Sequence, residues 1–124
     1  MDAEQYGQLS TWWRGHGWTP PPLEILPPLH VVTRHAAGFV YVSDPVAWLE
    51  WLVTDPSAPV QARAKDLLRV IKACEKLARS KGAKWVFSST NRPALVTVLE
   101  RCGYLVGDRE TTQMVKYLCQ PSQQ

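Results

Sequence analysis

The sequence predicts an α/β (α+β) domain built on a mixed, mostly antiparallel sheet, with one central parallel pair of strands and helices on both faces. Residues 47–54 and 83–90 are short apolar runs, as strands buried in a sheet are. Between them, residues 61–81 carry apolar side chains at helical spacing, and Gly82 is placed to end that helix. Two strands joined through a helix lie parallel with a right-handed crossover, so this unit is expected to organise the fold.

The segment before this unit predicts a helix, a proline-rich loop and a hairpin. Residues 2–14 are expected to form a short helix, which the glycines within residues 15–17 end. Prolines recur between residues 20 and 28 and forbid a regular helix, while the apolar residues among them favour a loop packed on the domain. Residues 29–34 and 38–42 predict an antiparallel hairpin with His35, Ala36 and Ala37 as its turn.

The segment after the unit predicts a second helix and two more strands. Asn91 is expected to cap this helix, with Pro93 in its first turn and Gly103 at its end. Residues 104–106 and 112–118 are expected to be the last two strands. The chain is thus divided into an N-terminal helix and loop at residues 1–28, a core at residues 29–118 and a disordered tail at residues 119–124.

Composition and charge indicate a single cytoplasmic domain that does not enter a membrane. The 124 residues suffice for one core, and no apolar run approaches the roughly 18 to 20 residues of a membrane span. The net charge of +3 is compatible with an anionic ligand and too small to argue for nucleic acid. The 3 cysteines lack metal-ligand spacing, so no metal site is expected. Their odd number favours free thiols, so a reducing compartment is expected.

Two stretches of the sequence resemble a known family. They read WLVTDPSAPVQARAKDLL at residues 51–68 and NRPALVTVLERCGYLV at residues 91–106. Together with the predicted order of elements, they resemble the Gcn5-related N-acetyltransferase (GNAT) fold over about residues 29–118. The run LEILPPL followed by a hairpin is similar to small, divergent GNAT-like proteins that phages encode.

The resemblance implies that the chain binds acetyl-CoA or another acyl-CoA where the strand passes into the helix. The family carries the pattern Arg/Gln-x-x-Gly-x-Gly/Ala there, and Pro59, Ala62 and Ala64 stand at its three positions, of which only Ala64 conforms. Such glycines let backbone N–H groups close on a pyrophosphate, and the small Ala62 preserves part of that cradle. The residues expected at the acyl-CoA are Val53, Thr54, Gln61, Ala62, Arg63, Ala64, Lys65 and Asn91. The alternatives are a helix cap for Asn91 and solvated charges for Arg63 and Lys65.

Glu50 is the residue expected to act as the catalytic base. It lies in the middle of an apolar strand, where a buried carboxylate is costly unless it is used or paired. In the resembled family a strand glutamate at about this place often deprotonates the amine acceptor. The alternative is an outward-facing or ion-paired glutamate. Leu99 stands where the family commonly has a tyrosine that protonates the departing thiolate.

The N-terminal aromatic residues suggest a rival hypothesis from another class. Trp12, Trp13, His16 and Trp18 are expected to offer an exposed anchor for a partner, the alternative being that the indoles are core. With Leu99, they favour a catalytically degenerate GNAT-fold phage protein that binds and modulates a host protein in the host cytoplasm. An exposed sheet edge makes a homodimer a further expectation. Nucleic acid is the least favoured partner, because the basic stripe of residues 65–79 is typical of a solvated helix face.

Overall fold

A four-stranded mixed sheet is the framework of the domain, and the computed structural model describes it within residues 1–118. The strands lie in the order β1-β2-β3-β4, which is also their order along the chain. The pairs β1–β2 and β2–β3 are antiparallel, whereas β3–β4 is parallel. Their bounds are β1 (His30–Val32), β2 (Ala36–Ser43), β3 (Val46–Thr54) and β4 (Trp85–Phe87). The prediction of a mixed, mostly antiparallel sheet with a parallel pair joined through a helix is therefore confirmed.

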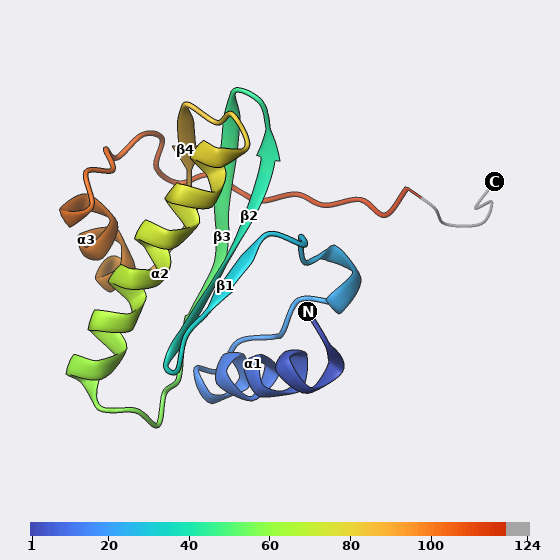
Figure 1. Cartoon of the computed structure of the whole chain (residues 1–124), viewed down its shortest axis with the longest axis vertical. Coiled ribbons are helices and arrows are strands. Elements are labelled where there is room, and N and C mark those ends of the chain that lie inside the picture. The colour runs from blue at the N-terminus through green and yellow to red at the C-terminus, as the bar shows by residue number, and fades with distance from the viewer. Residues whose placement is uncertain (119–124) are drawn as a thin grey trace.

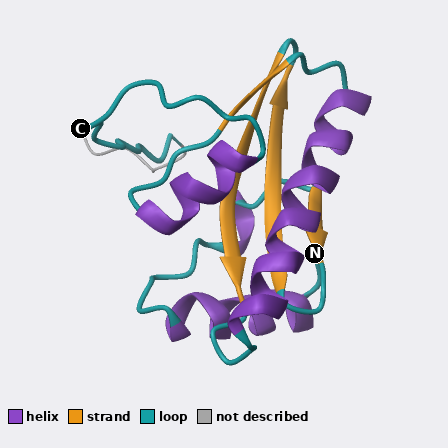
Figure 2. Ribbon diagram, turned by 90° about the vertical axis from the view of Figure 1, so that its left-hand side faces the viewer, coloured by secondary structure: helices purple, strands orange, loops and turns teal. Residues whose placement is uncertain are grey.

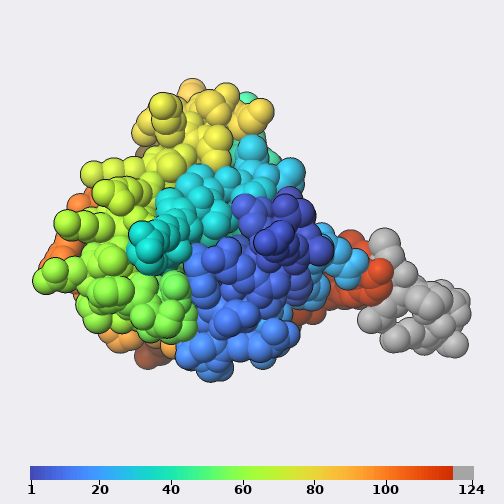
Figure 3. All heavy atoms as spheres, turned by 60° about the horizontal axis from the view of Figure 1, so that its bottom comes forward, coloured from blue at the N-terminus to red at the C-terminus, as the bar shows by residue number. Residues whose placement is uncertain are grey.

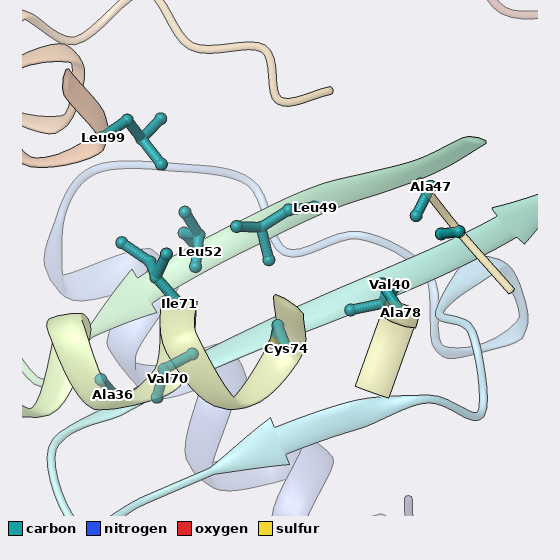
Figure 4. Packing of buried hydrophobic residues seen from close by; sticks show 11 residues of the cluster. Ala36, Val40, Ala47, Leu49, Leu52, Val70, Ile71, Cys74, Ala78 and Leu99 are labelled. Carbon is teal, nitrogen blue, oxygen red and sulfur yellow. The ribbon is translucent and has the colours of Figure 1, made fainter. Parts of the chain in front are cut away.

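Helices cover both faces of this sheet, as predicted. α2 (Val60–Ser80) and α3 (Pro93–Arg101) share one face, on which their apolar side chains and those of the strands form the larger core cluster. α1 (Ala3–Gly15) covers the other face at the foot of the strands (Figures 1 and 2). Figure 4 shows α2 lying across β2 and β3, with the buried side chains of helix and strands directed toward one another.

α1 forms because residues 2–15 combine a capped start with an apolar stripe. The Asp2 carboxylate accepts a hydrogen bond from the Gln5 N–H at 2.7 Å, which satisfies one of the free donors of the first turn. Leu9, Trp12 and Trp13 follow at spacings of three and four residues, and all three are buried against the sheet. Figure 3 shows the N-terminal segment, in blue, packed beside the segment of the first strands, in cyan.

The hairpin of β1 and β2 is tied to α2 at its turn. The buried carboxylate of Asp66 accepts hydrogen bonds from the Thr33 hydroxyl at 2.9 Å and from the His35 N–H at 2.8 Å. The predicted turn at residues 35–37 is wrong, because Ala36 and Ala37 already belong to β2 and are fully buried. They sit under helices on opposite faces of the sheet, where a small side chain lets the helices approach.

Close packing of α2 on the sheet also depends on Gly38. A Cβ atom built at this residue would lie 2.8 Å from both Leu52 Cδ2 and Val70 Cγ1, so even alanine would force these packed side chains to shift. At its far end α2 stops as predicted, since Gly82 adopts a φ of +94°, a conformation that favours glycine.

The C-terminal part of the chain departs from the prediction. Residues 104–106 and 112–118 form no strand, and within the described residues the sheet ends at β4. The parallel pair is consequently at the edge of the sheet and not central. Leu105, Met114, Val115 and Leu118 are more than four-fifths exposed, so these apolar side chains find no partner layer on this chain. The predicted tail at residues 119–124 lies outside the described residues.

Candidate functional site

β4 lies beside β3 only along the first residues of β3. Their ladder pairs Val46 with Trp85, Ala47 with Val86 and Trp48 with Phe87. One further link follows, in which the Ser88 hydroxyl donates to the Leu49 carbonyl oxygen at 2.7 Å. After that point β4 has ended and the chain leads through residues 88–92 into α3. Among the described residues, the edge of β3 that faces β4 therefore has no strand beside it from Glu50 to Thr54.

A bulge in β3 stands where the two strands part. Phe39 pairs with Glu50 and Ala37 with Val53, so two steps along β2 correspond to three along β3. The extra residue is accommodated at Trp51, whose φ of +59° is rare for an aromatic side chain and costs on the order of 1 to 3 kcal/mol. Sequence reasoning missed this feature, because no glycine marks it.

Hydrogen bonds to the proline-rich loop hold Trp51 in this conformation. Its indole N–H donates to the Tyr41 hydroxyl oxygen at 2.8 Å, and the Tyr41 hydroxyl donates to the Ile25 carbonyl oxygen at 2.7 Å. Ile25 belongs to a short 3-10 helix, η1 (Leu23–Ile25), within that loop. The loop thus supports the bulge from the same side of the sheet as α1.

Glu50 lies at the bulge and is neither fully buried nor exposed. Burial raises the pKa of Glu50 from its ordinary 4.5 to about 7, although the N–H of Ser89 donates to its carboxylate and partly counteracts the rise. A carboxyl group with such a pKa can take up a proton near neutral pH, which a general base must do.

An apolar slot of about 320 Å³ opens beside the unpaired half of β3. Its walls come from β3, α2 and α3, and its rim is polar. The predicted residues Val53 and Thr54 line it, Val53 with its side chain packed in the cluster beneath α1. The remaining lining residues are His16, Trp18, Leu52, Leu67, Arg92, Ala94, Leu95 and Val98.

Three side chains are stacked at the rim of the slot. The rings of His16 and Trp18 are 4.5 Å apart and nearly parallel, and the Arg92 guanidinium carbon lies 3.9 Å from the Trp18 ring centre. His16 Nε2 is 2.8 Å from the Thr54 carbonyl oxygen, to which it donates when this nitrogen carries the proton. Sequence reasoning missed Arg92, which directly precedes the proline at the start of α3.

A second, polar basin of about 480 Å³ lies on the other side of the first turns of α2. The predicted residues Gln61, Ala62 and Lys65 line it, with Arg34, His35, Pro59, Asp66 and Arg69. Asp66 has a structural role, because its carboxylate accepts hydrogen bonds from Thr33 and His35 at the hairpin turn and a third one from Arg69 at 2.9 Å. Burial raises the pKa of Asp66, but these three donors outweigh burial and leave that pKa below its ordinary value.

The start of α2 has no side-chain cap. Pro59 occupies the cap position, and it offers no side-chain acceptor to the first N–H groups of the helix. The first N–H groups of α2 thus remain free donors beside the basin, which Gln61 and Ala62 line, and an anion is favoured there. Of the other residues predicted here, Arg63 and Ala64 line neither cavity.

The remaining predicted site residues take other places. Asn91 is exposed and lines neither cavity, and the predicted cap at Asn91 is wrong because Arg92 occupies the N-cap position of α3. Trp12 and Trp13 are 5% and 2% exposed, so an exposed anchor is not available at either indole, which corrects that expectation. Leu99 is buried in the larger core cluster (Figure 4), with no hydroxyl to offer there.

No helix within residues 1–118 is long and apolar enough to span a bilayer. Nor do the described residues bring together three metal-ligating side chains.

Solved structures of acetyltransferases share this architecture, although no family model matches the chain and no curated protein is similar to it. A candidate acetyltransferase from Agrobacterium tumefaciens has a TM-score of 0.53 at 19% identity, over 73% of this chain and 71% of that one. A probable acetyltransferase has a TM-score of 0.57 at 12% identity, over 95% and 92% of the two chains. An acetyltransferase from Trypanosoma brucei has a TM-score of 0.49 at 20% identity. The matched region covers 64% of this chain and 57% of that protein's chain. The likeness at these identities is one of fold, and the fold is that of GNAT proteins.

Proposed function

We propose that this protein is an N-acyltransferase, which binds acetyl-CoA or another acyl-CoA in the slot beside β3 and transfers the acyl group to an amine. The observation that carries the proposal is the parting of β3 and β4 at a bulge. Glu50 lies at this bulge without lining the apolar slot, and the slot begins two residues later along β3, at Leu52. The GNAT fold of the chain supports the choice of an acyl-CoA as donor.

The residues present fit an acyl-CoA. The apolar walls of the slot, among them Leu52, Leu67 and Leu95, suit the uncharged pantetheine arm. The uncapped start of α2 offers backbone donors to the pyrophosphate, and the predicted residues Arg63 and Lys65 add positive charge on the same turns. Thr54, at the end of β3, and Asn91, in the segment between β4 and α3, are further proposed contacts to the acyl-CoA. The thioester would supply an activated acyl group.

Glu50 would supply the base for this reaction. It accepts a proton from the ammonium form of the acceptor, and the freed amine nitrogen then forms a bond to the acyl carbon as the carbon–sulfur bond breaks. When the new bond forms, the nitrogen carries one surplus proton, which it would release to water. Because Leu99 offers no proton, the departing thiolate would take its own proton from water. Because the pKa of Glu50 is about 7, its carboxylate can both accept a proton from the amine and release it again near neutral pH.

The donor site is tested with Ala62→Glu. The added carboxylate would stand at the start of α2 and repel the pyrophosphate, so we expect acetyl-CoA to bind at least about tenfold more weakly by calorimetry. The control is Ala3→Glu, which makes the same change on the exposed first turn of α1 and should leave binding intact. Circular dichroism of both variants establishes that the fold is kept. Absence of acetyl-CoA binding by the unaltered protein at millimolar ligand would contradict the proposal.

Two observations favour a second function, that of a GNAT-fold protein without turnover that binds and modulates a host protein in the cytoplasm. Leu99 replaces the family's acid and is packed in the core, and half-buried His16 and Trp18 present a polar and aromatic surface at the rim of the slot. The free thiols of Cys74 and Cys102 suit a cytoplasmic setting. Capture of one specific protein that His16→Ala with Trp18→Ala abolishes, together with no acetyl-CoA binding, would favour this function.

A further inference from the structure

The outer part of the sheet face that α1 leaves uncovered carries a set of exposed aromatic side chains. Val86 packs in the cluster beneath α2, so its neighbours Trp85 and Phe87 point to the opposite face of the sheet. Trp48 points to that face too, because its neighbours Ala47 and Leu49 belong to the same cluster. Trp85 is 68% exposed, Phe87 55% and Trp48 39%. The Trp48 and Phe87 rings stack at 6.1 Å. An apolar patch of this kind marks an interaction surface.

The same place has an open backbone edge. β4 pairs with β3 on one side, and no strand of the described residues pairs with its other side. The Trp85 N–H donates toward β3, to the Pro45 carbonyl oxygen at 3.2 Å, and successive peptide groups of a strand point to opposite sides. The Val86 N–H therefore points to the open edge, where it can pair with an added strand.

The chain also carries a segment that suits this edge. Residues 112–118, TQMVKYL, are rich in residues that favour strands, yet Met114 is 87% exposed, Val115 96% and Leu118 83%. Figure 1 shows this part of the chain as an extended line that projects beyond the helices and strands, and Figure 3 shows it leaving the body of the molecule. The single chain thus exposes both an apolar strand-forming segment and an edge that lacks a strand.

We propose that two copies of this chain form a two-fold dimer, in which residues 112–118 of each copy pair with the open edge of β4 in the other and cover Trp48, Trp85 and Phe87. Nine residues separate Cys102, the C-cap of α3, from Thr112, and an extended chain of that length reaches roughly 30 Å, enough to cross to a neighbour. Two-fold symmetry gives each copy one segment to donate and one edge to fill, which closes the assembly as a dimer.

The surface available fits a stable dimer. A large aromatic side chain can bury about 150 to 250 Å², and the aromatic patch and the apolar segment each occur twice in the assembly. Together they suffice for the roughly 1,200 to 2,000 Å² that a specific interface buries. This dimer does not depend on the proposed acyl transfer, since it uses neither the slot nor Glu50.

The mass of the full chain in solution is the first measurement. Light scattering after size exclusion should give twice the 14.0 kDa of one chain. Met114→Lys with Val115→Lys should give a monomer, because charges then replace the apolar contacts of the segment. The control is Thr111→Lys with Gln113→Lys, which adds the same charge at two polar positions just before Met114 and should stay largely dimeric. A wild type of 14.0 kDa at every concentration, or a dimer that persists in the segment variant, overturns the proposal.

Mixing two variants tests the exchange itself. Val86→Pro removes the N–H at the open edge, a position where a strand tolerates proline, and should also be monomeric. The segment variant keeps its edge and the edge variant keeps its segment, so a mixture of the two should form a heterodimer with one exchanged strand. No heterodimer from two folded variants would contradict the inference.

Hydrogen exchange serves where Val86→Pro fails to fold. Amides of residues 112–118 should be protected at high protein concentration and lose that protection on dilution. Protection that is independent of concentration in a monomer would mean that the segment folds back on its own sheet, and would overturn the dimer.

Discussion

The two halves of β3 differ in what lies beside them. From Val46 to Trp48 the strand has β2 on one side and β4 on the other, and its Ala47 is fully buried. From Glu50 to Thr54 it keeps β2 but has lost β4, and here lie the bulge, the carboxyl group with the raised pKa and the apolar slot. In a strand paired on both sides, the backbone N–H and C=O groups form hydrogen bonds within the sheet, whereas an unpaired edge leaves these groups free to bind a ligand.

The largest effect on stability should come from Leu49, which directly follows the paired region and accepts a hydrogen bond from the Ser88 hydroxyl. Leu49→Ala removes a fully buried side chain and leaves a closed cavity, so we expect a loss of about 2 to 5 kcal/mol in the free energy of unfolding by urea titration. Leu52→Ala is the matched change in the unpaired half. It widens an existing slot and should cost less stability while altering acetyl-CoA affinity. Equal losses from the two variants would erase the proposed difference between the halves.

Glu50→Gln should show that the Glu50 carboxylate in the unpaired half of β3 lowers the stability of the folded protein at neutral and higher pH. Since the pKa of Glu50 is raised from 4.5 to about 7, the folded protein holds this proton more tightly than the unfolded chain does. Its contribution to stability is greatest below pH 4.5 and declines as the pH rises from 4.5 to about 7. The glutamine variant should therefore be more stable than the wild type at pH 8, by about 1 to 2 kcal/mol once solvent screening is allowed for.

The same variant tests catalysis. The turnover of an amine acceptor by Glu50→Gln should fall by about a hundredfold or more, with little change in the affinity for acetyl-CoA. In the wild type, the rate should rise with pH to a plateau near 7, which the variant should lack. An unchanged rate and pH profile would dismiss Glu50 as the base.

The smallest expected effect concerns the support of the bulge. Trp51→Phe and Tyr41→Phe each remove one member of the hydrogen bond at 2.8 Å, and each should cost about 1 kcal/mol of stability. Their effects should couple in a double-mutant cycle, by about 0.5 kcal/mol or more. Tyr6→Phe is the control, because its hydroxyl donates to Pro21 elsewhere in the same loop and should combine additively with Trp51→Phe.

The elements that the sequence predicted correctly are those with a strong local pattern. The apolar spacing in α2, the glycine after it and the capped start of α1 act within a few residues, so they can be read without knowledge of the fold. The parallel arrangement of β3 and β4 also followed, because a helix between two strands leaves little choice of direction. The proposed site at the end of β3 and the start of α2 rests on the same arrangement and stays a prediction.

The errors arise where a neighbour from elsewhere in the chain decides the outcome. Residues 112–118 have the composition of a strand, but composition does not supply the second strand with which to pair. Trp12 and Trp13 look like an anchor beside the polar N-terminus, yet Phe39 and the sheet bury them. The slot joins His16, Leu67 and Arg92 from three separate elements, and no local pattern brings these together.

The sequence by itself determined the order and type of the helices and strands up to α3, because hydrophobic periodicity and turn residues act locally. The tertiary structure alone decided that β3 bulges at Trp51, that Glu50 is buried enough for its pKa to reach about 7, and that a slot lies beside the unpaired half of the strand. Burial, strain and cavities depend on contacts between segments far apart in the chain, and these contacts exist only once the sheet and its helices have packed.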